Sequence, residues 1–362
     1  MLIAVLIIVV VIAGVMLFMK TERFGKVASG VLLERIKKSP NYRDGKFQNI
    51  HFTPQLQEGV SYFTIMRKFF FGKSKRSQPS VALPSVVTNL HTLADNSLVW
   101  FGHSSYFIKL DGKTFLIDPV FSGNASPVKF TTKSFAGTDV YSADDFPEVD
   151  YLFISHDHWD HLDYETVLAL KPKVKKIITA MGVGAHLERW RFDKNIIIEK
   201  DWNEEIILAP GFVVNTVTGS HFSGRGFKRD QSLWMGFVLS TPECKLFLGG
   251  DSGYDTHFAA IGEKFGPFDI AMLECGQYNE MWHYIHMMPE EVVQAAIDLH
   301  AKKLMPVHWG KFSLSIHSWD EPVIRVTNEA LHKNIPVVTP MIGEPVDLTA
   351  DKVWKKWWTD ID

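Results

Sequence analysis

The chain of 362 residues contains little cysteine and little net charge. Its two cysteines, Cys244 and Cys275, exclude a disulfide scaffold and a cysteine-based zinc site, so any metal must be held by histidine or carboxylate. The formal charge of −3 and the lack of a basic patch argue against a nucleic-acid partner. No G-x-S-x-G segment is present, which excludes the usual serine nucleophile. The hydrophobic content of 46% suffices for one large core or two modest ones.

Charged side chains are also absent from residues 1–19. Nineteen helical residues extend about 28 Å, close to the hydrocarbon thickness of a bilayer, so this segment predicts a transmembrane anchor. A cleaved signal peptide would need a basic residue before the apolar run and a small-residue cleavage site after it, and neither is present. Basic residues begin at Lys20, after the span, which predicts a single-pass protein with a cytoplasmic catalytic domain.

Two further segments combine aromatic and basic side chains. In the linking region, residues 20–95, three phenylalanines at 69–71 lie between lysines and arginines. The tail, residues 350–362, contains three tryptophans and three lysines. Such segments can lie in the headgroup region of a membrane, where aromatic rings reach the acyl boundary and amines contact anionic lipid. They can equally pack on the catalytic domain, and the sequence leaves both alternatives open.

Short β-rich runs alternate with helical patterns over residues 96–349, the predicted catalytic domain. Strands are expected at 98–101, 105–110, 114–117, 151–154, 176–180, 196–198, 212–217, 233–239, 245–248, 268–273, 303–307 and 336–339. Asp111-Gly112 predicts a hairpin turn, and helices are expected at 183–190 and 289–299. The mixture predicts an α/β layered domain with helices covering sheets.

Three histidines and three aspartates occupy the nine residues 155–163, directly after a predicted buried strand. Imidazole and carboxylate are preferred ligands of zinc and related divalent ions. His156, His158 and Asp160 alternate along the chain and can therefore converge on one point, whereas His161 breaks the alternation and indicates a second metal. A polar loop with an aspartate as helix cap is the alternative, and the density of ligand-type residues disfavours it.

Three more ligand-type residues follow predicted strands, as the first cluster does. His221 comes after the strand at 212–217, and His308 directly follows the strand at 303–307. Asp251 follows Gly249-Gly250, where glycine lets the backbone approach a ligand closely. A single histidine is more often structural than ligating, but the shared position at strand ends favours ligation for this set.

The H-x-H-x-D-H motif, the histidine after a strand, the G-G-D-S segment and the late P-V-H together resemble the metallo-β-lactamase-fold hydrolases. The resemblance implies an αββα sandwich with a two-metal site at one edge. It implies His156, His158 and His221 as ligands of the first metal and Asp160, His161 and His308 as ligands of the second. Asp251 would be the bridging carboxylate. The implied cofactor is two Zn²⁺ or another divalent metal.

Within these hydrolases, the chain resembles the N-acyl-phosphatidylethanolamine-hydrolysing phospholipase D group over residues 98–325. The segments that match are Trp100-Phe101-Gly102-His103-Ser104-Ser105, Leu116-Ile117-Asp118-Pro119-Val120-Phe121-Ser122, His221-Phe222-Ser223-Gly224-Arg225, Ser232-Leu233-Trp234, Gly249-Gly250-Asp251-Ser252-Gly253-Tyr254, His286-Met287-Met288-Pro289-Glu290-Glu291 and Val307-His308-Trp309-Gly310-Lys311-Phe312. The predicted membrane span replaces the soluble leader of that group, and Trp159 stands where relatives often have tyrosine.

Asp160, Asp251 and His286 are predicted to be catalytic, and His286, which precedes a predicted helix start, is expected to protonate the leaving group or to bind phosphate. Substrate contacts are expected from Trp159, Phe222, Arg225 and His286. For His286 and Arg225 the alternatives are a hydrogen bond at the helix start and a solvated loop arginine. His103 and His317 lie in similar segments, either to orient metal ligands or in structural roles.

The predicted function is a membrane-anchored, zinc-dependent phosphodiesterase that releases phosphatidic acid and an N-acylethanolamine from phospholipid. Its predicted partners are the phospholipid substrate and the membrane, without nucleic acid, and a homodimer is left open. The same fold also serves lactonases and phosphodiesterases of soluble substrates, because function does not follow from fold. A non-catalytic membrane scaffold is the alternative from another class, which the complete ligand set disfavours.

Overall fold

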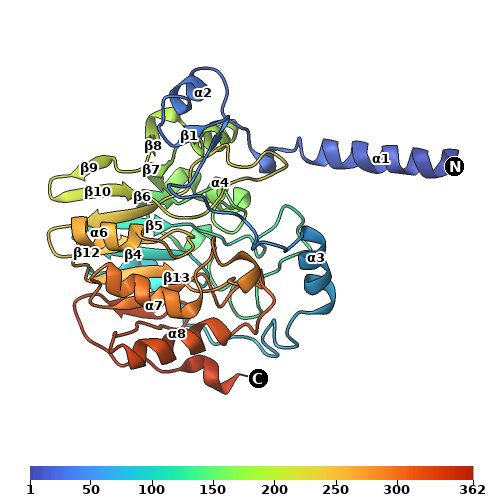
Figure 1. Ribbon diagram of the computed structural model, residues 1–362. Helices are drawn as coiled ribbons and strands as arrows, with labels where there is room; N and C mark the ends of the chain where they lie inside the picture. Colours follow the sequence, from blue (N-terminus) through green and yellow to red (C-terminus); the bar gives the residue numbers. More distant parts are fainter. Residues whose placement is uncertain (362) are drawn as a thin grey trace.

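Two β-sheets lie face to face in the computed structural model, which describes residues 1–361 (Figure 1). One sheet has the strand order β15 (Pro345–Asp347), β3 (Ser97–Trp100), β4 (Tyr106–Leu110), β5 (Lys113–Ile117), β6 (Val149–Ile154), β7 (Val174–Ala180) and β8 (Ile197–Lys200). The other has the order β14 (Leu304–Val307), β13 (Ile270–Glu274), β12 (Lys245–Leu248), β11 (Gly236–Ser240), β10 (Phe212–Val217) and β9 (Glu205–Ala209). Both sheets are mixed, with antiparallel hairpins giving way to parallel strands.

Helices cover the outer faces of the two sheets. The seven-stranded sheet is accompanied by α4 (Tyr164–Leu170) and α5 (Gly184–Arg189), and α5 contacts β8. The six-stranded sheet is covered by α6 (His257–Phe265), α7 (Pro289–Asp298) and α8 (Glu321–His332). The helix α7 contacts β13 and β14, and α8 packs on α7. This layering confirms the predicted αββα sandwich.

The inner faces of the sheets share one hydrophobic core. Phe153 of β6 and Phe237 of β11 meet edge to face with ring centroids 5.0 Å apart, and Phe115 of β5 stacks near Phe212 of β10. Such buried aromatic pairs contribute about 0.5–1.5 kcal/mol each beyond the area they bury. The β4–β5 hairpin turns at Asp111-Gly112, both with positive φ, as expected from a two-residue turn of this type.

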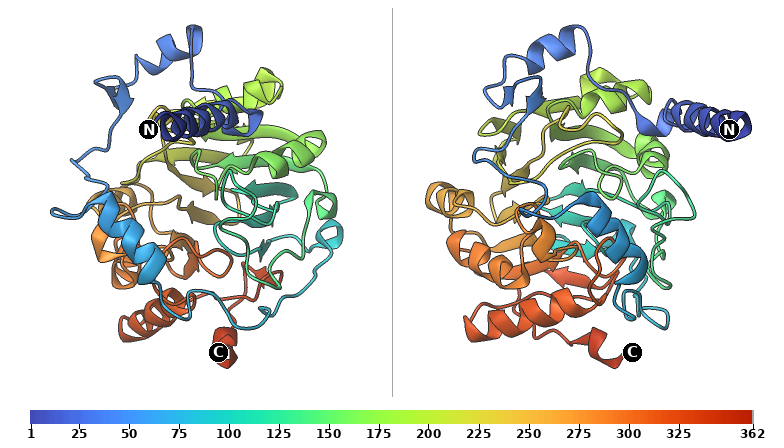
Figure 2. Two further views of the ribbon diagram at one scale, coloured as in Figure 1. Left: turned by 90° about the vertical axis from the view of Figure 1, so that its right-hand side faces the viewer. Right: turned by 45° about the vertical axis from the view of Figure 1, so that its right-hand side comes forward.

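The N-terminal helix α1 (Leu2–Phe18) projects away from the sandwich and has no buried residue (Figures 1 and 2). Within residues 1–361, no helix combines the length and apolar character needed to cross a membrane. The predicted transmembrane anchor at residues 1–19 is therefore not supported, nor is the single-pass arrangement.

The linking region forms short elements that wrap around the sandwich. They are α2 (Val31–Ile36), a hairpin of β1 (Tyr42–Arg43) and β2 (Lys46–Phe47), and α3 (Tyr62–Phe71). Ile36 and Phe47 are fully buried, which ties the region to the catalytic domain. The helix α3 begins at a cap, because the Ser61 hydroxyl accepts a hydrogen bond from Thr64 N at 3.2 Å.

The C-terminal tail also packs on the catalytic domain. Trp357 and Trp358 are buried, and the ring of Trp357 stacks on Trp309 with centroids 5.3 Å apart. The indole nitrogen of Trp357 donates a hydrogen bond to Pro340 O. Of the two alternatives for the tail, the structure supports packing on its own domain, since these two rings are not available to a bilayer.

Candidate metal centre

The predicted metal loop follows β6, the strand in the middle of the seven-stranded sheet's parallel half. The loop turns tightly after His158, whose carbonyl accepts hydrogen bonds from His161 N at 3.1 Å and Leu162 N at 2.8 Å. Because of this turn, His161 faces a different point from His156 and His158, as the break in alternation indicated.

Three loops of the six-stranded sheet bring the remaining ligands to the same place. His221 follows β10, Asp251 follows β12 and His308 follows β14. Before Asp251, a Cβ at Gly249 would lie 2.7 Å from Met272 O, and a Cβ at Gly250 would lie 2.6 Å from Met235 O. Only glycine therefore fits where this loop passes between its neighbours.

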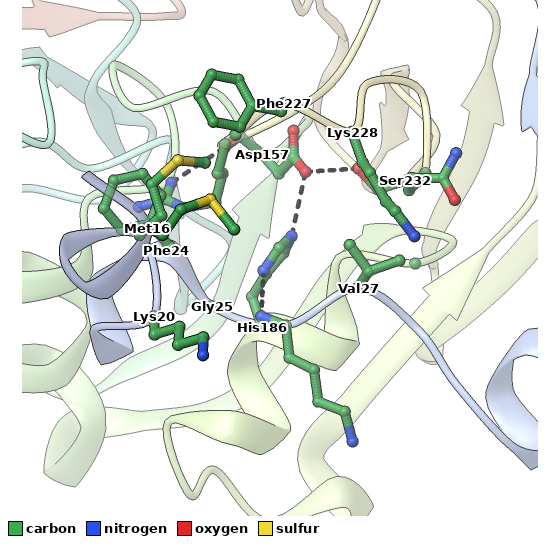
Figure 3. Close-up of a pocket in the computed structure, with 16 residues that line it drawn as sticks. Met16, Lys20, Phe24, Gly25, Val27, Asp157, His186, Phe227, Lys228 and Ser232 are labelled. Carbon is green, nitrogen blue, oxygen red and sulfur yellow. Dashed lines mark hydrogen bonds and ion pairs between the residues drawn. The ribbon is translucent and has the colours of Figure 1, made fainter. Parts of the chain in front are cut away.

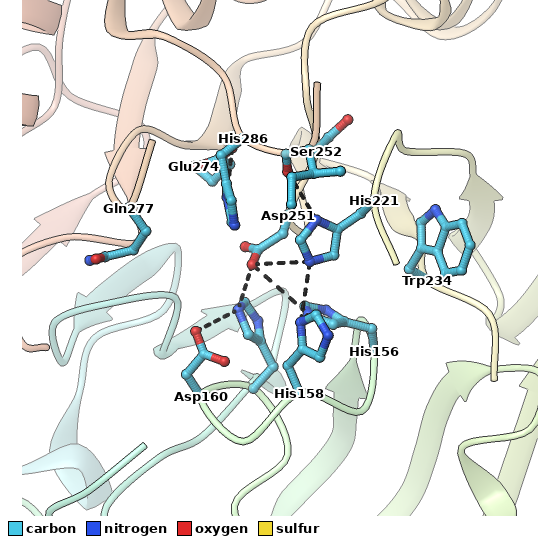
Figure 4. A network of polar contacts seen from close by, with 12 residues as sticks. His156, His158, Asp160, His221, Trp234, Asp251, Ser252, Glu274, Gln277 and His286 are labelled. Carbon is cyan, nitrogen blue, oxygen red and sulfur yellow. Dashed lines mark hydrogen bonds and ion pairs between the residues drawn. The ribbon is translucent and has the colours of Figure 1, made fainter. Parts of the chain in front are cut away.

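His156, His158, His221 and Asp251 form the first group of potential ligands (Figure 4). Nδ1 of His158 lies 2.9 Å from His156 Nε2 and 3.2 Å from His221 Nε2. Asp251 Oδ2 lies 3.9 Å from His156 Nε2 and 3.7 Å from His221 Nε2. Donor atoms around one tetrahedral zinc ion are about 3.3 Å apart, because each zinc–nitrogen bond is about 2.0–2.1 Å. The group matches that spacing.

A second group contains Asp160, His161 and His308, together with His103. Asp160 Oδ2 lies 3.6 Å from His161 Nε2 and 3.9 Å from His308 Nε2. Asp251 reaches this group too, since its Oδ2 lies 3.2 Å from His161 Nε2. The structure thus brings together all seven predicted ligands and puts Asp251 between the two groups.

The chemistry of the donor set fits a divalent metal. His161 Nε2 and Asp251 Oδ1 are buried and make no hydrogen bond, although burying a polar atom without a partner is costly. Burial lowers the pKa of His158 to about 4, so its imidazole is neutral and has a lone pair to offer at neutral pH. Burial alone would raise the pKa of Asp251, but His161, His308 and His221 outweigh it and hold that pKa well below its usual range.

Each histidine ligand except His158 has its second ring nitrogen fixed by a hydrogen bond. These pairs are His156 Nδ1 with Ser155 Oγ (2.9 Å), His161 Nδ1 with Asp118 Oδ2 (2.8 Å), His221 Nδ1 with Ile285 O (2.9 Å) and His308 Nδ1 with Ser104 Oγ (2.9 Å). His103 Nε2 lies 2.8 Å from Asp160 Oδ2. Partners of this kind set the tautomer and orientation of a metal ligand.

Asp118, Ser104 and Ser155 were not predicted as site residues. A signal for Asp118 exists, because it directly follows β5, whose parallel neighbour β6 leads into the metal loop. His103 has the orienting role that was one of its two alternatives. His317 does not reach the centre: its Nδ1 pairs with Ser318 O and its ring stacks on Tyr278.

A cavity of about 400 Å³ opens onto the centre. Its lining includes the ligand-type residues His158, Asp160, Asp251, His286 and His308, the polar residues Gln55, Tyr62, Arg229 and Gln277, and an apolar wall. The apolar wall comprises Leu56, Ile65, Phe69, Phe222, Trp282, Ile285 and Leu314. Phe222 lies on this wall as predicted, with its ring centroid 4.5 Å from that of His158.

His286 lines the same cavity and points toward Asp251 (Figure 4). Its Nδ1 is 3.3 Å from Oε1 of Glu274, a fully buried carboxyl at the end of β13. Burial raises the pKa of Glu274 to about 7. Burial would lower the pKa of His286, but Glu274 outweighs it and raises that pKa. The pair therefore holds a proton beside the cavity near neutral pH.

Arg225 and Trp159 lie elsewhere, which corrects their predicted role as substrate contacts. The Arg225 guanidinium is buried and donates to Arg23 O, Asp157 O and Leu162 O, so little of it remains for phosphate. The Arg225 Cζ atom lies 3.8 Å from the centroid of the Trp159 ring, and that ring contacts the ring of Phe24 edge to face. Both side chains fasten the metal loop to the N-terminal segment.

A second cavity, also of about 400 Å³, lies behind the metal loop at the base of α1 (Figure 3). Its polar floor is already hydrogen-bonded, since Asp157 accepts from Ser232 Oγ at 2.7 Å and pairs with His186 Nε2 at 3.1 Å. His186 Nδ1 in turn accepts from Lys26 N. This network holds the metal loop in place. The cavity that contains the metal ligands is therefore the candidate site of the reaction.

Comparisons with known proteins agree with this geometry. The family model described as "Beta-lactamase superfamily domain" matches residues 113–309, which include the whole metal centre except His103 and Ser104. The chain belongs to the beta-lactamase superfamily. Its match to the superfamily, together with the ligand groups, makes it a metal-dependent hydrolase.

Two known proteins resemble the chain in sequence and one in structure. An uncharacterized protein of Mycobacterium tuberculosis, Rv0906, is 36% identical over 335 residues, covering 89% of this chain and 88% of the relative. N-acyl-phosphatidylethanolamine-hydrolyzing phospholipase D 1 of Caenorhabditis elegans is 31% identical over 253 residues, covering 62% and 67%. The structure of Igni18, a metallo hydrolase of Ignicoccus hospitalis, superposes with a TM-score of 0.54 at 21% identity, covering 69% and 97%, which supports the fold.

Proposed function

We propose that the protein is a phospholipase D-type phosphodiesterase that hydrolyses N-acyl-phosphatidylethanolamine or a similar phospholipid. The products would be phosphatidic acid and an N-acylethanolamine. The similarity to the Caenorhabditis elegans phospholipase supports the reaction type. Two zinc ions, held by the two ligand groups that share Asp251, are the proposed cofactor.

One observation carries the proposal: the metal ligands and seven apolar side chains line a single cavity. A phosphodiester with acyl chains needs both, because the phosphate must reach the metals while hydrocarbon is removed from water. The apolar wall has its own small core of Met281, Trp282 and Ile285, on which Leu56, Ile65 and Phe69 pack. The polar residues Gln55, Tyr62, Arg229 and Gln277 also line the cavity, but the seven apolar side chains favour a substrate with hydrocarbon chains over a small polar one.

The metals would supply Lewis acidity toward the phosphoryl oxygens and the attacking water. Asp251 and Asp160 would orient the water on the face of phosphorus opposite the ethanolamine oxygen, and Asp251 would accept its proton. The P–O bond to the N-acylethanolamine would then break. His286, whose proton is maintained by Glu274, would protonate the departing alkoxide oxygen.

Arg229 is the cation that the cavity offers to the phosphate in place of Arg225. Its guanidinium lies 5.0 Å from the centroid of Phe222, and one nitrogen donates to Gln55 Oε1 at 3.3 Å. Its side chain is exposed and has further N–H groups free for a phosphoryl oxygen. Arg229 would therefore offer the phosphate a contact within the cavity that also contains the metal ligands.

The direct test is to incubate the purified, metal-loaded protein with vesicles containing N-acyl-phosphatidylethanolamine and to measure phosphatidic acid by mass spectrometry. We expect release that stops on addition of a chelator and returns with Zn²⁺. If a protein with a full complement of metal releases none, the lipid substrate is excluded.

A further inference from the structure

The helix α3 is apolar on two opposite sides. Ile65 and Phe69 point inward, where Phe69 stacks on Trp282 with ring centroids 6.2 Å apart and both line the cavity. The other side presents Phe63, Met66, Phe70 and Phe71 to solvent, with exposed fractions of 57–88%. A soluble surface seldom gathers large apolar side chains in this way without a partner.

The charge around α3 indicates which partner. Residues 60–80 contain five basic residues and no acidic one, although the whole chain has a net charge of −3. Lys73 and Arg76 are used within the fold, since they bond to Ser313 and Asp320. The side chains of Arg67, Lys68 and Lys75 are the remaining three, all exposed. Aromatic rings flanked by free cations match the boundary between acyl chains and anionic headgroups.

The position of α3 connects this surface to the reaction. Its inner face forms part of the cavity wall, so a lipid leaving a bilayer under α3 would pass directly toward the metal ligands. Figure 2 shows α3 on the side of the molecule from which α1 projects, whereas β9 lies on the other side in Figure 1. The helix α3 therefore lies on the side of the molecule from which α1 projects, and its inner residues Ile65 and Phe69 line the cavity.

We propose that the outer face of α3, made by Phe63, Met66, Phe70 and Phe71 with Arg67, Lys68 and Lys75, docks on an anionic lipid bilayer. The docked helix lies flat in the headgroup region and opens the cavity to lipid drawn from that bilayer. The part of this proposal that concerns substrate entry rests on the proposed lipid phosphodiesterase function, whereas the docking itself does not.

The first experiment locates contact at one position of the full-length protein. Because Cys244 and Cys275 are buried, a polarity-sensitive fluorophore can be attached selectively at a thiol introduced by Phe71→Cys. The matched control is Ile207→Cys on β9, which is 73% exposed on the other side. With vesicles containing phosphatidylglycerol, we expect a blue shift of emission for the label at 71 and none at 207. An unchanged label at 71 overturns the proposal.

A blue shift at 71 without lipid that grows with protein concentration would also overturn it, because a second copy of the chain would then cover α3.

The second experiment combines Phe70→Ser and Phe71→Ser and measures hydrolysis of vesicle lipid and of a short-chain phosphodiester dissolved as monomers. We expect the rate of hydrolysis of vesicle lipid to fall about tenfold and the rate on the monomeric phosphodiester to stay unchanged. Equal rates on vesicles for variant and wild type would refute delivery by α3. Failure of the proposed function would look different: neither substrate would be cleaved, while the label at 71 would still respond.

Discussion

Three residues at the centre have left-handed backbone conformations that are unusual for side chains other than glycine. His103, Asp118 and His308 have φ of 54°, 40° and 68°. Each such conformation costs on the order of 1 kcal/mol or more and persists only where surrounding structure enforces it. All three contact a predicted ligand or are one, so at the centre this strained backbone helps to direct donor atoms.

Asp251→Asn tests the shared carboxylate. The amide keeps the shape of the side chain but cannot accept the proton of the attacking water or bind two cations. We expect turnover to fall on the order of 10³-fold, in the range seen when a central electrostatic group is removed. Metal content, measured by plasma mass spectrometry, should fall by no more than one ion per chain. Near-normal turnover would contradict the role proposed for Asp251.

Arg229→Ala tests the proposed phosphate contact. A charge-assisted hydrogen bond contributes about 1.5–3 kcal/mol, so KM should rise roughly 10- to 100-fold while kcat changes much less. Steady-state kinetics on a monomeric phosphodiester measures both. The control is Lys228→Ala, which removes a neighbouring exposed cation that lines the other cavity. Equal effects of the two substitutions would show that only general surface charge is involved.

At the scale of elements, the sequence predicts strands well where apolar runs are bounded by turns, and less well where packing decides. The expected strand at 212–217 coincides with β10, and the expected helix at 289–299 with α7 (Pro289–Asp298). The run at 336–339 forms no strand and makes one bridge, between Val337 and Leu304, at the sheet edge. The strand β9, which pairs with β10 directly after it, and the helix α8, which packs on α7, were not predicted.

The strand β13 ends in Glu274, and its titration should affect stability. The ordinary carboxyl titrates near 4.5, whereas burial raises the pKa of Glu274 to about 7, and the pKa of His286 is raised as well. Between these pH values the folded state binds more protons than the unfolded state. The free energy of unfolding therefore falls as pH rises from 4.5 through 7, by on the order of 2–3 kcal/mol.

Glu274→Gln should remove this decrease while keeping the acceptor for Met287 N, which lies 2.9 Å from Oε1. Urea unfolding of chelator-treated wild type and variant at pH 5 and pH 8 measures it. We expect the variant to gain stability relative to wild type at pH 8 but not at pH 5. The same difference at both pH values would exclude titration of Glu274 as the cause.

For the whole molecule, the metal centre is a link between two sheets. Four of the predicted ligands follow β6 in the seven-stranded sheet, and the other three follow β10, β12 and β14 in the six-stranded sheet. When the free metal concentration is a thousand times the dissociation constant, binding adds about 4 kcal/mol to the free energy of unfolding.

Removal of metal should therefore lower the melting temperature by at least about 5 °C. Differential scanning calorimetry before and after dialysis against chelator measures the change, and Zn²⁺ should restore the original value. As a control, Asp251→Asn should show a smaller shift. An identical melting temperature with and without metal would contradict the idea that the ion joins the sheets.

The metal ligands could be read from the sequence because they are close together or follow strands. The substrate wall could not, since Leu56, Ile65 and Phe69 become part of the cavity only after the linking region folds across the centre. Arg225 shows the same limit. Its neighbours in the sequence suggested a phosphate contact, but its guanidinium donates instead to three carbonyl groups that are distant in the chain.

The apolar wall has a consequence for how such enzymes diverge. Its side chains at 56, 65 and 69 lie outside residues 113–309, the part matched by the superfamily domain. Three of the seven apolar wall residues are therefore encoded upstream of the domain that carries the metal ligands, while Phe222, Trp282 and Ile285 lie within it. Mutations upstream of the domain would change that part of the wall without altering the ligands. Relatives that share every metal ligand can thus differ in substrate, and exchange of the upstream stretch offers a route to redesigned specificity.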